Sequence, residues 1–284
     1  MKITALVVTY NRIEWLKKNV SAILSQTRKP DEFIIVDNAS TDSTSEFLSV
    51  LSSTHDHIVV KRLNENIGGS GGFSTGLKTA VERGADWVWM MDDDALPYPD
   101  ALKEVEWAIS KVGNDVGVVL SKLVKSPNII PKRKISNARI GTFVGFAVSA
   151  NVVKKIGVPD AGFFIYADDY EYSLRVKKNG FRMVKIASSL IEHRDWIKQK
   201  RIFRFPFSKP SIPPWKVYYI FRNTINATRN SKLIGLAVKG YFFIDQYVWG
   251  YVNPSAKPYA LRGFKDGLNG VEGKTVDPKD PKWK

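Results

Sequence analysis

The sequence has no cysteine among its 284 residues. Neither a disulfide framework nor a thiolate metal site can form, and the composition suits a reducing compartment. Long hydrophobic runs are also absent, because Leu233 to Val252, the best candidate for a membrane span, is broken by Lys239 and Asp245. After Lys2 the first apolar stretch is too short to predict a signal peptide. We therefore expect neither a secreted, disulfide-bonded protein nor an integral membrane protein.

Negative charge is scarce in the last third of the chain. Residues 1–181 carry 23 Lys and Arg against 21 Asp and Glu, whereas residues 182–284 carry 20 against 7, so the local net charges are +2 and +13. This asymmetry favours an anionic partner, namely a membrane surface, a nucleic acid or a phosphorylated substrate. The chain is 44% hydrophobic, which is enough to bury a sizeable core.

Short apolar runs recur through the first part of the chain, and each predicts a buried strand. They cover residues 3–9, 33–36, 58–63 and 87–91. Segments with helical spacing separate them, such as the one that carries Trp15, Val20 and Ile23. Strands that alternate with helices predict an α/β fold with a mainly parallel central sheet flanked by helices.

Polar side chains follow three of these strands. They are Thr9, Asn11 and Arg12 after the first strand, Asp37 and Asn38 after the second, and Asp92, Asp93 and Asp94 after the fourth. Ligands of parallel sheets bind beyond the carboxyl ends of the strands. We therefore expect all three clusters to lie at one edge of the sheet.

The three consecutive acids Asp92, Asp93 and Asp94 are the most informative of these clusters. Adjacent carboxylates repel one another, so a strand end tolerates them poorly unless a cation is close by. Clustered oxygen ligands suit Mg²⁺ or Mn²⁺, particularly when a phosphate supplies further oxygens. The alternative is a solvated acidic turn before a helix that starts near Pro99.

A glycine-rich stretch, Asn66 to Phe73, connects the third and fourth expected strands. When such a loop opens a helix, its backbone N–H groups can bind an anion. The alternative is a flexible turn. The glycine spacing does not match the dinucleotide-binding fingerprint, which argues against a nicotinamide cofactor.

A second acidic pair, Asp168 and Asp169, stands where a helix is expected to begin. The helix dipole favours negative charge there, so either residue could serve simply as a cap. Further strands are expected over residues 143–150 and 183–191, and His193 follows the second of them. A lone histidine is more often structural than a ligand, although neutral imidazole is a common metal ligand beside carboxylates.

The region after residue 195 is basic and aromatic. Lysine and arginine alternate with phenylalanine and proline from Trp196 to Trp215, and helices are expected over residues 215–229, 233–252 and 259–268. The aromatic side chains could pack on the core, meet a membrane surface, or do both. Residues 122–139 are expected to form a long basic loop, and the residues from Gly270 onward a polar, extended tail.

Taken together, these stretches resemble the family 2 glycosyltransferases, which have the nucleotide-sugar-binding fold called GT-A. The resemblance covers roughly residues 3–195 and continues more weakly to about residue 268. It rests on the segments Val8 to Arg12, Val36 to Asp42, Asn66 to Gly69, Asp92 to Asp94 and Asp168 to Glu171.

The arrangement of Asp169 and His193 looks most like bacterial galactofuranosyltransferases. Rhamnosyltransferases, which share the Tyr218 to Asn223 segment, come next. Ala167 departs from the pattern, because better-known members place Trp before the acid pair.

The resemblance implies a metal-dependent, inverting transfer from a nucleoside-diphosphate sugar, with UDP-galactofuranose as the expected donor and dTDP-rhamnose as the alternative. The site residues that it implies fall into three groups. Asp169 is the expected general base with Asp168 as the alternative; Asp92, Asp94 and His193 are the expected ligands of Mn²⁺ or Mg²⁺; Thr9, Asn11, Arg12, Asp37, Asn66, Gly69, Asp92 and Asp93 are expected to bind the nucleotide.

The expected acceptor is a glycan, or a lipid-linked glycan of cell-surface polysaccharide synthesis. We expect residues 1–195 to form the catalytic domain and residues 196–284 to form a basic helical region that faces the acceptor and the membrane. The positive charge of this region leads us to expect peripheral contact with an anionic membrane, at the cytoplasmic face of the plasma membrane.

Three other classes remain open from the residues alone. The basic C-terminal region would suit a nucleic-acid-binding protein, but the acidic strand ends would repel phosphate, so no nucleic acid is expected. A non-catalytic sugar- or nucleotide-binding module would not need the complete set of acids. A nucleotidyltransferase would release pyrophosphate rather than a nucleoside diphosphate.

Overall fold

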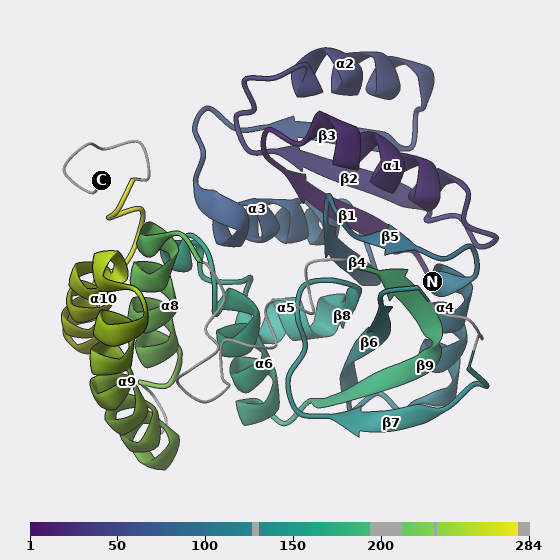
Figure 1. The fold of residues 1–284 in the computed structure, drawn as a ribbon. Helices are drawn as coiled ribbons and strands as arrows, with labels where there is room; N and C mark the ends of the chain where they lie inside the picture. Colours follow the sequence, from purple (N-terminus) through teal and green to yellow (C-terminus); the bar gives the residue numbers. More distant parts are fainter. Residues whose placement is uncertain (127–130, 194–211, 230–231, 278–284) are drawn as a thin grey trace.

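The computed structural model describes residues 1–126, 131–193, 212–229 and 232–277. Within these ranges, nine strands form one mixed sheet, and helices cover both of its faces (Figure 1). The strands are β1 (Ile3–Thr9), β2 (Glu32–Asp37), β3 (Ile58–Arg62), β4 (Trp87–Asp92), β5 (Leu96–Pro97), β6 (Val116–Val124), β7 (Ile135–Ala138), β8 (Phe146–Ser149) and β9 (Arg182–Glu192). The helices are α1 (Ile13–Leu24), α2 (Thr44–Thr54), α3 (Gly68–Glu82), α4 (Ala101–Lys111), α5 (Ala150–Ile156), η1 (Ala161–Phe163), α6 (Asp168–Lys178), α8 (Pro214–Ala227), α9 (Lys232–Val252), η3 (Pro254–Ala256) and α10 (Lys257–Asn269).

The strand order across the sheet is β3-β2-β1-β4-β8-β6-β9-β5, and β7 pairs with β9. The first four strands pair in parallel, with Thr9 opposite Asp37 and Val8 opposite Asp92. Their carboxyl ends therefore lie at one edge, as the sequence predicts. The α/β class with flanking helices is confirmed, but the sheet is mixed, because β8, β5 and β7 pair antiparallel with their neighbours. Hydrophobic runs predict strands without fixing their direction.

The two faces of the sheet carry separate hydrophobic cores because the side chains of each strand alternate. On β1, Ile3, Ala5 and Val7 pack with helices α1, α2 and α4. Leu6 and Val8 point the other way and pack with α3, α5 and α6. The fold is thus a three-layer sandwich, and the edge where β1, β2 and β4 end is left for polar side chains.

Helix α3 can approach the sheet closely because glycines face β1. A Cβ atom at Gly72 would lie 2.5 Å from Val8, and one at Gly76 would lie 2.2 Å from Leu6. The glycine-rich stretch is therefore neither a flexible turn nor a free loop, since Gly68 to Gly72 form the first residues of α3.

Three expectations differ from the structure. Part of the basic loop over residues 122–139 is ordered as the end of β6 and as β7. The segment over residues 270–277 packs against the molecule instead of extending away, because Val276 is fully buried and exchanges hydrogen bonds with the Tyr219 hydroxyl. The expected strand over residues 143–150 begins only at Phe146. The run from Trp196 to residue 211 and the expected domain boundary at residues 195 and 196 lie outside the described residues.

The three C-terminal helices pack together beside α6 (Figure 1). Helices α8 and α10 touch along glycines of α10, since a Cβ atom at Gly263 would lie 2.4 Å from the Tyr218 carbonyl oxygen. In the part of the chain that is described, no helix is both long enough and apolar enough to cross a membrane.

Candidate active site

A cavity of about 690 Å³ lies at the carboxyl edge of the sheet. Several parts of the chain line it: the strand ends of the first half, residues 142–144, the start of α6 with the residues before it, His193 after β9, and the C-terminal region. The lining includes Thr9, Tyr10, Arg12, Asn38, Asn66, Gly68, Gly69, Asp92, Asp93, Asp94, Phe164, Tyr166, Asp168, Asp169, His193, Trp215, Lys216, Lys274 and Asp277. Most of the residues singled out in the sequence therefore meet in one place.

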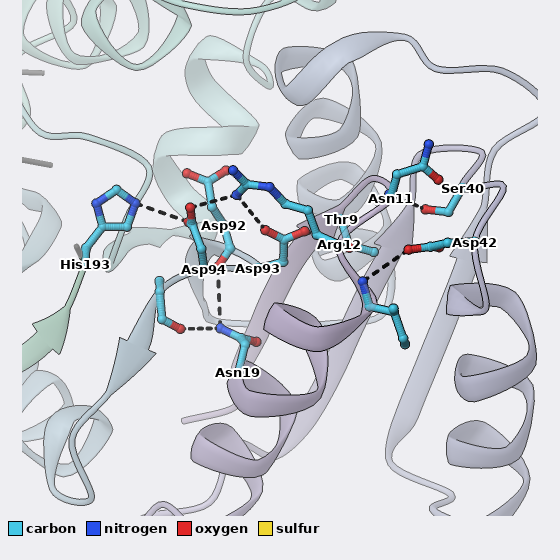
Figure 2. A network of polar contacts seen from close by, with 12 residues as sticks. Thr9, Asn11, Arg12, Asn19, Ser40, Asp42, Asp92, Asp93, Asp94 and His193 are labelled. Atoms are coloured by element: carbon cyan, nitrogen blue, oxygen red, sulfur yellow. Dashed lines mark hydrogen bonds and ion pairs between the residues drawn. The ribbon is translucent and has the colours of Figure 1, made fainter. Parts of the chain in front are cut away.

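The acidic turn after β4 is held by hydrogen bonds from β1 and α1. Asp93 accepts from the Thr9 hydroxyl at 2.8 Å and from Arg12 Nη1 at 3.2 Å, and Arg12 Nη1 also donates to Asp94 at 2.7 Å (Figure 2). Asn19 in α1 is fully buried and donates to the Ala95 carbonyl oxygen at 2.6 Å. Only 3% of Asp93 is exposed, so the turn is not a solvated acidic loop.

Asp92, Asp94 and His193 form a cluster of possible metal ligands. One donor atom from each lies within 4.8 Å of the others, and His193 Nε2 is 3.2 Å from Asp94 Oδ1 (Figure 2). The short strand β5 explains this approach, because it pairs antiparallel with β9 and places Leu96 opposite Glu192. The acidic turn and the residue after β9 are therefore brought side by side.

The electrostatics of the acidic turn favour a bound cation. Burial, together with the charges of Asp94 and Asp93, raises the pKa of Asp92 to about 7. Burial also raises the pKa of Asp93, to about 6. Burial opposes ionisation of Asp94 too, but the hydrogen bond and charge of His193, together with Arg12, lower its pKa to about 2. A positive ion beside Asp92 would relieve this repulsion.

The donor set fits a divalent cation. Carboxylate oxygens suit Mg²⁺ and Mn²⁺, and imidazole nitrogen is a common companion ligand of transition metals. Two carboxylates and one imidazole leave coordination positions for phosphate oxygens. The expectation of Mn²⁺ or Mg²⁺ agrees with this cluster, which does not distinguish between the two ions.

The second acidic pair stands at the start of α6. Ala167 occupies the N-cap position with φ 63°, so neither Asp168 nor Asp169 is the cap. Asp169 Oδ1 accepts from the Tyr170 backbone N–H at 2.7 Å. Burial raises the pKa of both carboxyl groups, and for Asp169 the charge of Asp168 raises it further, to about 8. Two buried carboxyl groups with raised pKa values suit proton transfer better than structural capping.

The start of α3 is shaped by an amide pair. Asn38 Nδ2 donates to Asn66 Oδ1 at 3.0 Å and to the Gly68 carbonyl oxygen at 2.9 Å. The Ile67 backbone N–H donates back to Asn38 Oδ1 at 3.0 Å. Gly69 lines the cavity and has open space where a Cβ atom would be. Asn66 and Gly69 are therefore placed to face a ligand, and Asn38 positions them.

Asn11 and Asp37 are not among the lining residues of this cavity. Asp37 is 1% exposed, accepts from the Ser40 backbone N–H at 2.9 Å and pairs with Arg62 at 3.3 Å. Asn11 Oδ1 accepts from the Thr41 backbone N–H at 2.7 Å. Both residues shape the loop after β2, and nucleotide binding by them stays a prediction.

Sequence reasoning missed the contribution of the C-terminal region to the cavity. Trp215 and Lys216 come from the start of α8, and Lys274 and Asp277, which pair at 2.8 Å, come from the segment after α10. The polar composition of that segment indicated an exposed tail. Its position depends on long-range packing, for which the sequence carries no local signal.

The sheet is mixed, and its carboxyl edge gathers an acidic turn, a nearby histidine and a second buried acid pair. Together these features indicate the GT-A class of glycosyltransferases. The family model described as glycosyl transferase family 2 matches residues 4–166. The chain belongs to this family.

Particular relatives agree with this assignment. The galactofuranosyltransferase GlfT1 of Mycolicibacterium smegmatis is 28% identical over 202 residues, an alignment that covers 63% of this chain and 66% of that protein. The chain thus spans slightly less than two thirds of this relative. The structure of S. aureus TarS superposes with a TM-score of 0.60 at 17% identity, covering 95% of this chain and 49% of that one. The mannosyltransferase PcManGT from Pyrobaculum calidifontis, in complex with GDP-Man and Mn²⁺, gives 0.59 at 19% identity, covering 94% and 75%. The predicted resemblance to galactofuranosyltransferases and the GT-A fold are confirmed.

The cluster predicts which carboxylates bind metal. Asp94→Asn and His193→Gln should each weaken Mn²⁺ binding by at least about 10-fold, because each replaces a carboxylate or imidazole donor with a weaker amide oxygen. Titration of the protein with Mn²⁺, followed by electron paramagnetic resonance, measures the affinity directly. Asp93→Asn is the matched control from the same turn, since the Asp93 carboxylate is bound by Thr9 and Arg12. If Asp93→Asn weakens Mn²⁺ binding as strongly as Asp94→Asn, the assignment of ligands is wrong.

Proposed function

We propose that this glycosyltransferase moves galactofuranose from UDP-galactofuranose to a glycan acceptor, with inversion at the anomeric carbon. The observation that carries the proposal is the meeting of the Asp92, Asp94 and His193 cluster with the Asp168 and Asp169 pair in one cavity. The choice of donor is supported by relatives that are themselves named galactofuranosyltransferases.

One side of the cavity suits the nucleoside diphosphate. Asp92, Asp94 and His193 would hold a divalent cation, which when bound neutralises the charge that develops on the leaving diphosphate. Arg12 and Asp93 keep the acidic turn in place through the ion pair between them. Thr9, Asn66 and Gly69 line the same cavity, and the nucleotide would bind along them. In this proposal Asn11 and Asp37 act on the nucleotide through the loop after β2.

The other side of the cavity suits the acceptor. Asp169 accepts the proton of the acceptor hydroxyl as that oxygen attacks the anomeric carbon, on the face opposite the leaving group. Its raised pKa makes it a stronger base than an exposed carboxylate, but it must lose its own proton first. The rate should therefore rise with pH through the pKa of Asp169.

The neighbouring carboxyl group should tune this pH dependence. The charge of Asp168 is the second-largest cause, after burial, of the raised pKa of Asp169. Asp168→Asn removes this charge and lowers the pKa of Asp169, so the rise in kcat/KM should move to lower pH. The measurement is kcat/KM for nucleoside-diphosphate release between pH 5 and pH 9. Asp169→Asn should lose nearly all turnover across this range, by about 10²–10⁴-fold. If Asp168→Asn is the inactive variant and Asp169→Asn retains turnover, the two roles are reversed.

The donor is tested by release of nucleoside diphosphate from a panel of nucleotide sugars with Mn²⁺. UDP-galactofuranose, UDP-galactopyranose, UDP-glucose and dTDP-rhamnose form the panel. UDP should be released from UDP-galactofuranose in preference to the others, and Asp94→Ala should abolish the release. Turnover of dTDP-rhamnose instead would keep the class of enzyme and refute the donor. Release of pyrophosphate would indicate a nucleotidyltransferase.

In the same proposal the acceptor is lipid-linked, and the region after residue 195 brings the enzyme to the cytoplasmic face of the membrane. Helix α9 supports this, because it presents a continuous apolar stripe to solvent at i, i+3, i+4 and i+7 spacing. The exposed fractions are 84% for Leu233, 71% for Leu236, 52% for Phe243, 66% for Ile244 and 60% for Tyr247. In Figure 1 this helix lies at the opposite end of the molecule from α2.

The opposite stripe of α9 is buried, with Phe242 2% and Trp249 3% exposed, so the helix is anchored on its inner side. The exposed residues Lys257 and Lys265 follow in α10, in a part of the chain whose net charge is +13. Apolar side chains beside lysines match the interface of an anionic bilayer, into which such helices bury their apolar face.

Vesicle flotation tests this surface. The protein should float at low salt with phosphatidylglycerol-containing vesicles and less with phosphatidylcholine alone, because acidic lipids attract the basic region. Leu236→Glu combined with Ile244→Glu should abolish flotation. Val50→Glu is the control, because Val50 is 64% exposed in α2. A wild-type protein that stays with the soluble fraction, or that dimerises through this stripe during size-exclusion chromatography, would refute the membrane contact.

A further inference from the structure

The backbone leading into the Asp168 and Asp169 pair is held in an unfavourable conformation. Phe164, Tyr166 and Ala167 have φ values of 63°, 65° and 63°, in the left-handed region that side chains other than glycine rarely adopt. At Phe164, ψ is −67° and the next N–H donates to the carbonyl oxygen of the previous residue at 2.8 Å. This is the rare, strained form of the γ-turn. Such conformations persist only where the surrounding structure holds them.

Asn223 of α8 binds this backbone through its side-chain amide. Asn223 Nδ2 lies 2.7 Å from the Phe163 carbonyl oxygen. It also lies 2.6 Å from the carbonyl oxygen of Ile165 and 3.0 Å from that of Tyr166. Only 1% of Asn223 is exposed, so no water can replace these bonds. One amide group thus fixes the carbonyl groups on both sides of the turn.

Arg222 supports the same segment and ties it to the C-terminal residues. It is fully buried, its Nε donates to Asn223 Oδ1 at 2.7 Å, and its Nη2 donates to the Phe163 carbonyl oxygen at 3.0 Å. Its Nη1 donates to the Gly273 carbonyl oxygen at 2.6 Å and to the Thr275 hydroxyl at 3.0 Å. With Nη2 also donating to the Gly162 carbonyl oxygen at 3.2 Å, all five N–H groups of the guanidinium have acceptors.

We propose that Arg222 and Asn223 are positioning residues for the transfer reaction, a role that rests on the proposed function of Asp169 as general base. By holding the segment from Gly162 to Tyr166, they fix the start of α6 and thereby the direction in which the Asp169 carboxylate meets the acceptor. Through Gly273 and Thr275 they also place the segment that brings Lys274 to the cavity. A small displacement of a catalytic group is enough to slow a reaction severely.

This role predicts a separation between turnover and binding of the nucleotide. Thr9, Asp93 and Arg12 on the nucleotide side are held by their own hydrogen bonds, which do not involve α8. The start of α3, beside Asn66 and Gly69, meets the segment before α6 through the bond from the Ser70 N–H to the Phe164 carbonyl oxygen. Loosening that segment should therefore lower kcat strongly and raise the donor KM only slightly. A purely structural role would lower the melting temperature without altering the kcat of the folded enzyme.

The test is Asn223→Asp in the chain of 284 residues. This change keeps the size of the side chain and the acceptor for Arg222, but turns an oxygen instead of an N–H group toward three carbonyl oxygens. We expect kcat for nucleoside-diphosphate release to fall by about 10–100-fold, with donor KM within about twofold of wild type. Hydrogen–deuterium exchange should become faster in peptides covering residues 161–170.

Asn226→Asp is the matched control on the same helix. Asn226 Oδ1 also accepts from an arginine, Arg229, at 2.9 Å, and its Nδ2 donates to the Val271 carbonyl oxygen at 2.9 Å, but its side chain makes no hydrogen bond with residues 162–166. It should keep the wild-type kcat and the wild-type exchange over residues 161–170. If Asn223→Asp does not fold, Arg222→Lys provides the same readouts. Lysine keeps the positive charge but lacks the planar guanidinium group with its five N–H donors.

Three outcomes decide the proposal. Wild-type kcat in Asn223→Asp would overturn it, as would an equal loss of kcat in Asn226→Asp or unchanged exchange over residues 161–170. Failure of the proposed function looks different: the wild-type protein would then release no nucleoside diphosphate from any donor. In that case the exchange experiment still decides whether Arg222 and Asn223 hold the segment before α6.

Discussion

Arg12 donates from a single terminal nitrogen to both Asp93 and Asp94. These two acids belong to the five carboxyl groups that the acidic turn and the start of α6 bring to one cavity. Burying that much negative charge is costly unless cations or hydrogen bonds compensate for it. Arg12 and His193 compensate for Asp94, while Asp92, Asp168 and Asp169 keep raised pKa values. The uncompensated part of the charge is what suits the site to a divalent cation on one side and to proton transfer on the other.

The sheet makes this concentration of charge possible. Parallel pairing of β1 with β2 and β4 brings three strand ends together, and the antiparallel pairing of β5 with β9 delivers His193 from about 100 residues away along the chain. Because the positions are fixed by backbone hydrogen bonds and by the cores on both faces of the sheet, the carboxylates cannot move apart to relieve their repulsion. The stability of the rigid layers thus maintains an arrangement that the acidic turn would not adopt alone.

The sequence predicts those parts of the fold and site that depend on local patterns. Apolar runs that alternate with helical segments predicted β1 to β4 and the edge of the sheet at which these strands end. The acids after β4 could be assigned to that edge because the carboxyl ends of parallel strands lie together. Strand direction could not be predicted for β8, and β5 has only two residues, too few for any pattern. Asn38 was visible as a polar residue after β2, but its role in shaping the start of α3 depends on Asn66, 28 residues away. The segment around Lys274 was misjudged, because its burial comes from Tyr219 and Arg222 and not from its own composition.

The C-terminal helices are therefore more than an attachment to the nucleotide-binding layers. Helix α8 contributes Trp215 and Lys216 to the cavity at its first turn, and two turns later it contributes buried donors to the backbone that leads into Asp168. The strained turn at Phe164 has no glycine that would make it favourable, so the free energy that maintains it comes from packing and hydrogen bonds with α8 and with the start of α3. Helix α9 packs on the same bundle, with its apolar stripe facing outward. A force that orients α9 on a surface would thus act on α8, the helix that also holds the start of α6. In the proposed function, this coupling would connect the surface where the acceptor arrives with the carboxyl group that receives its proton.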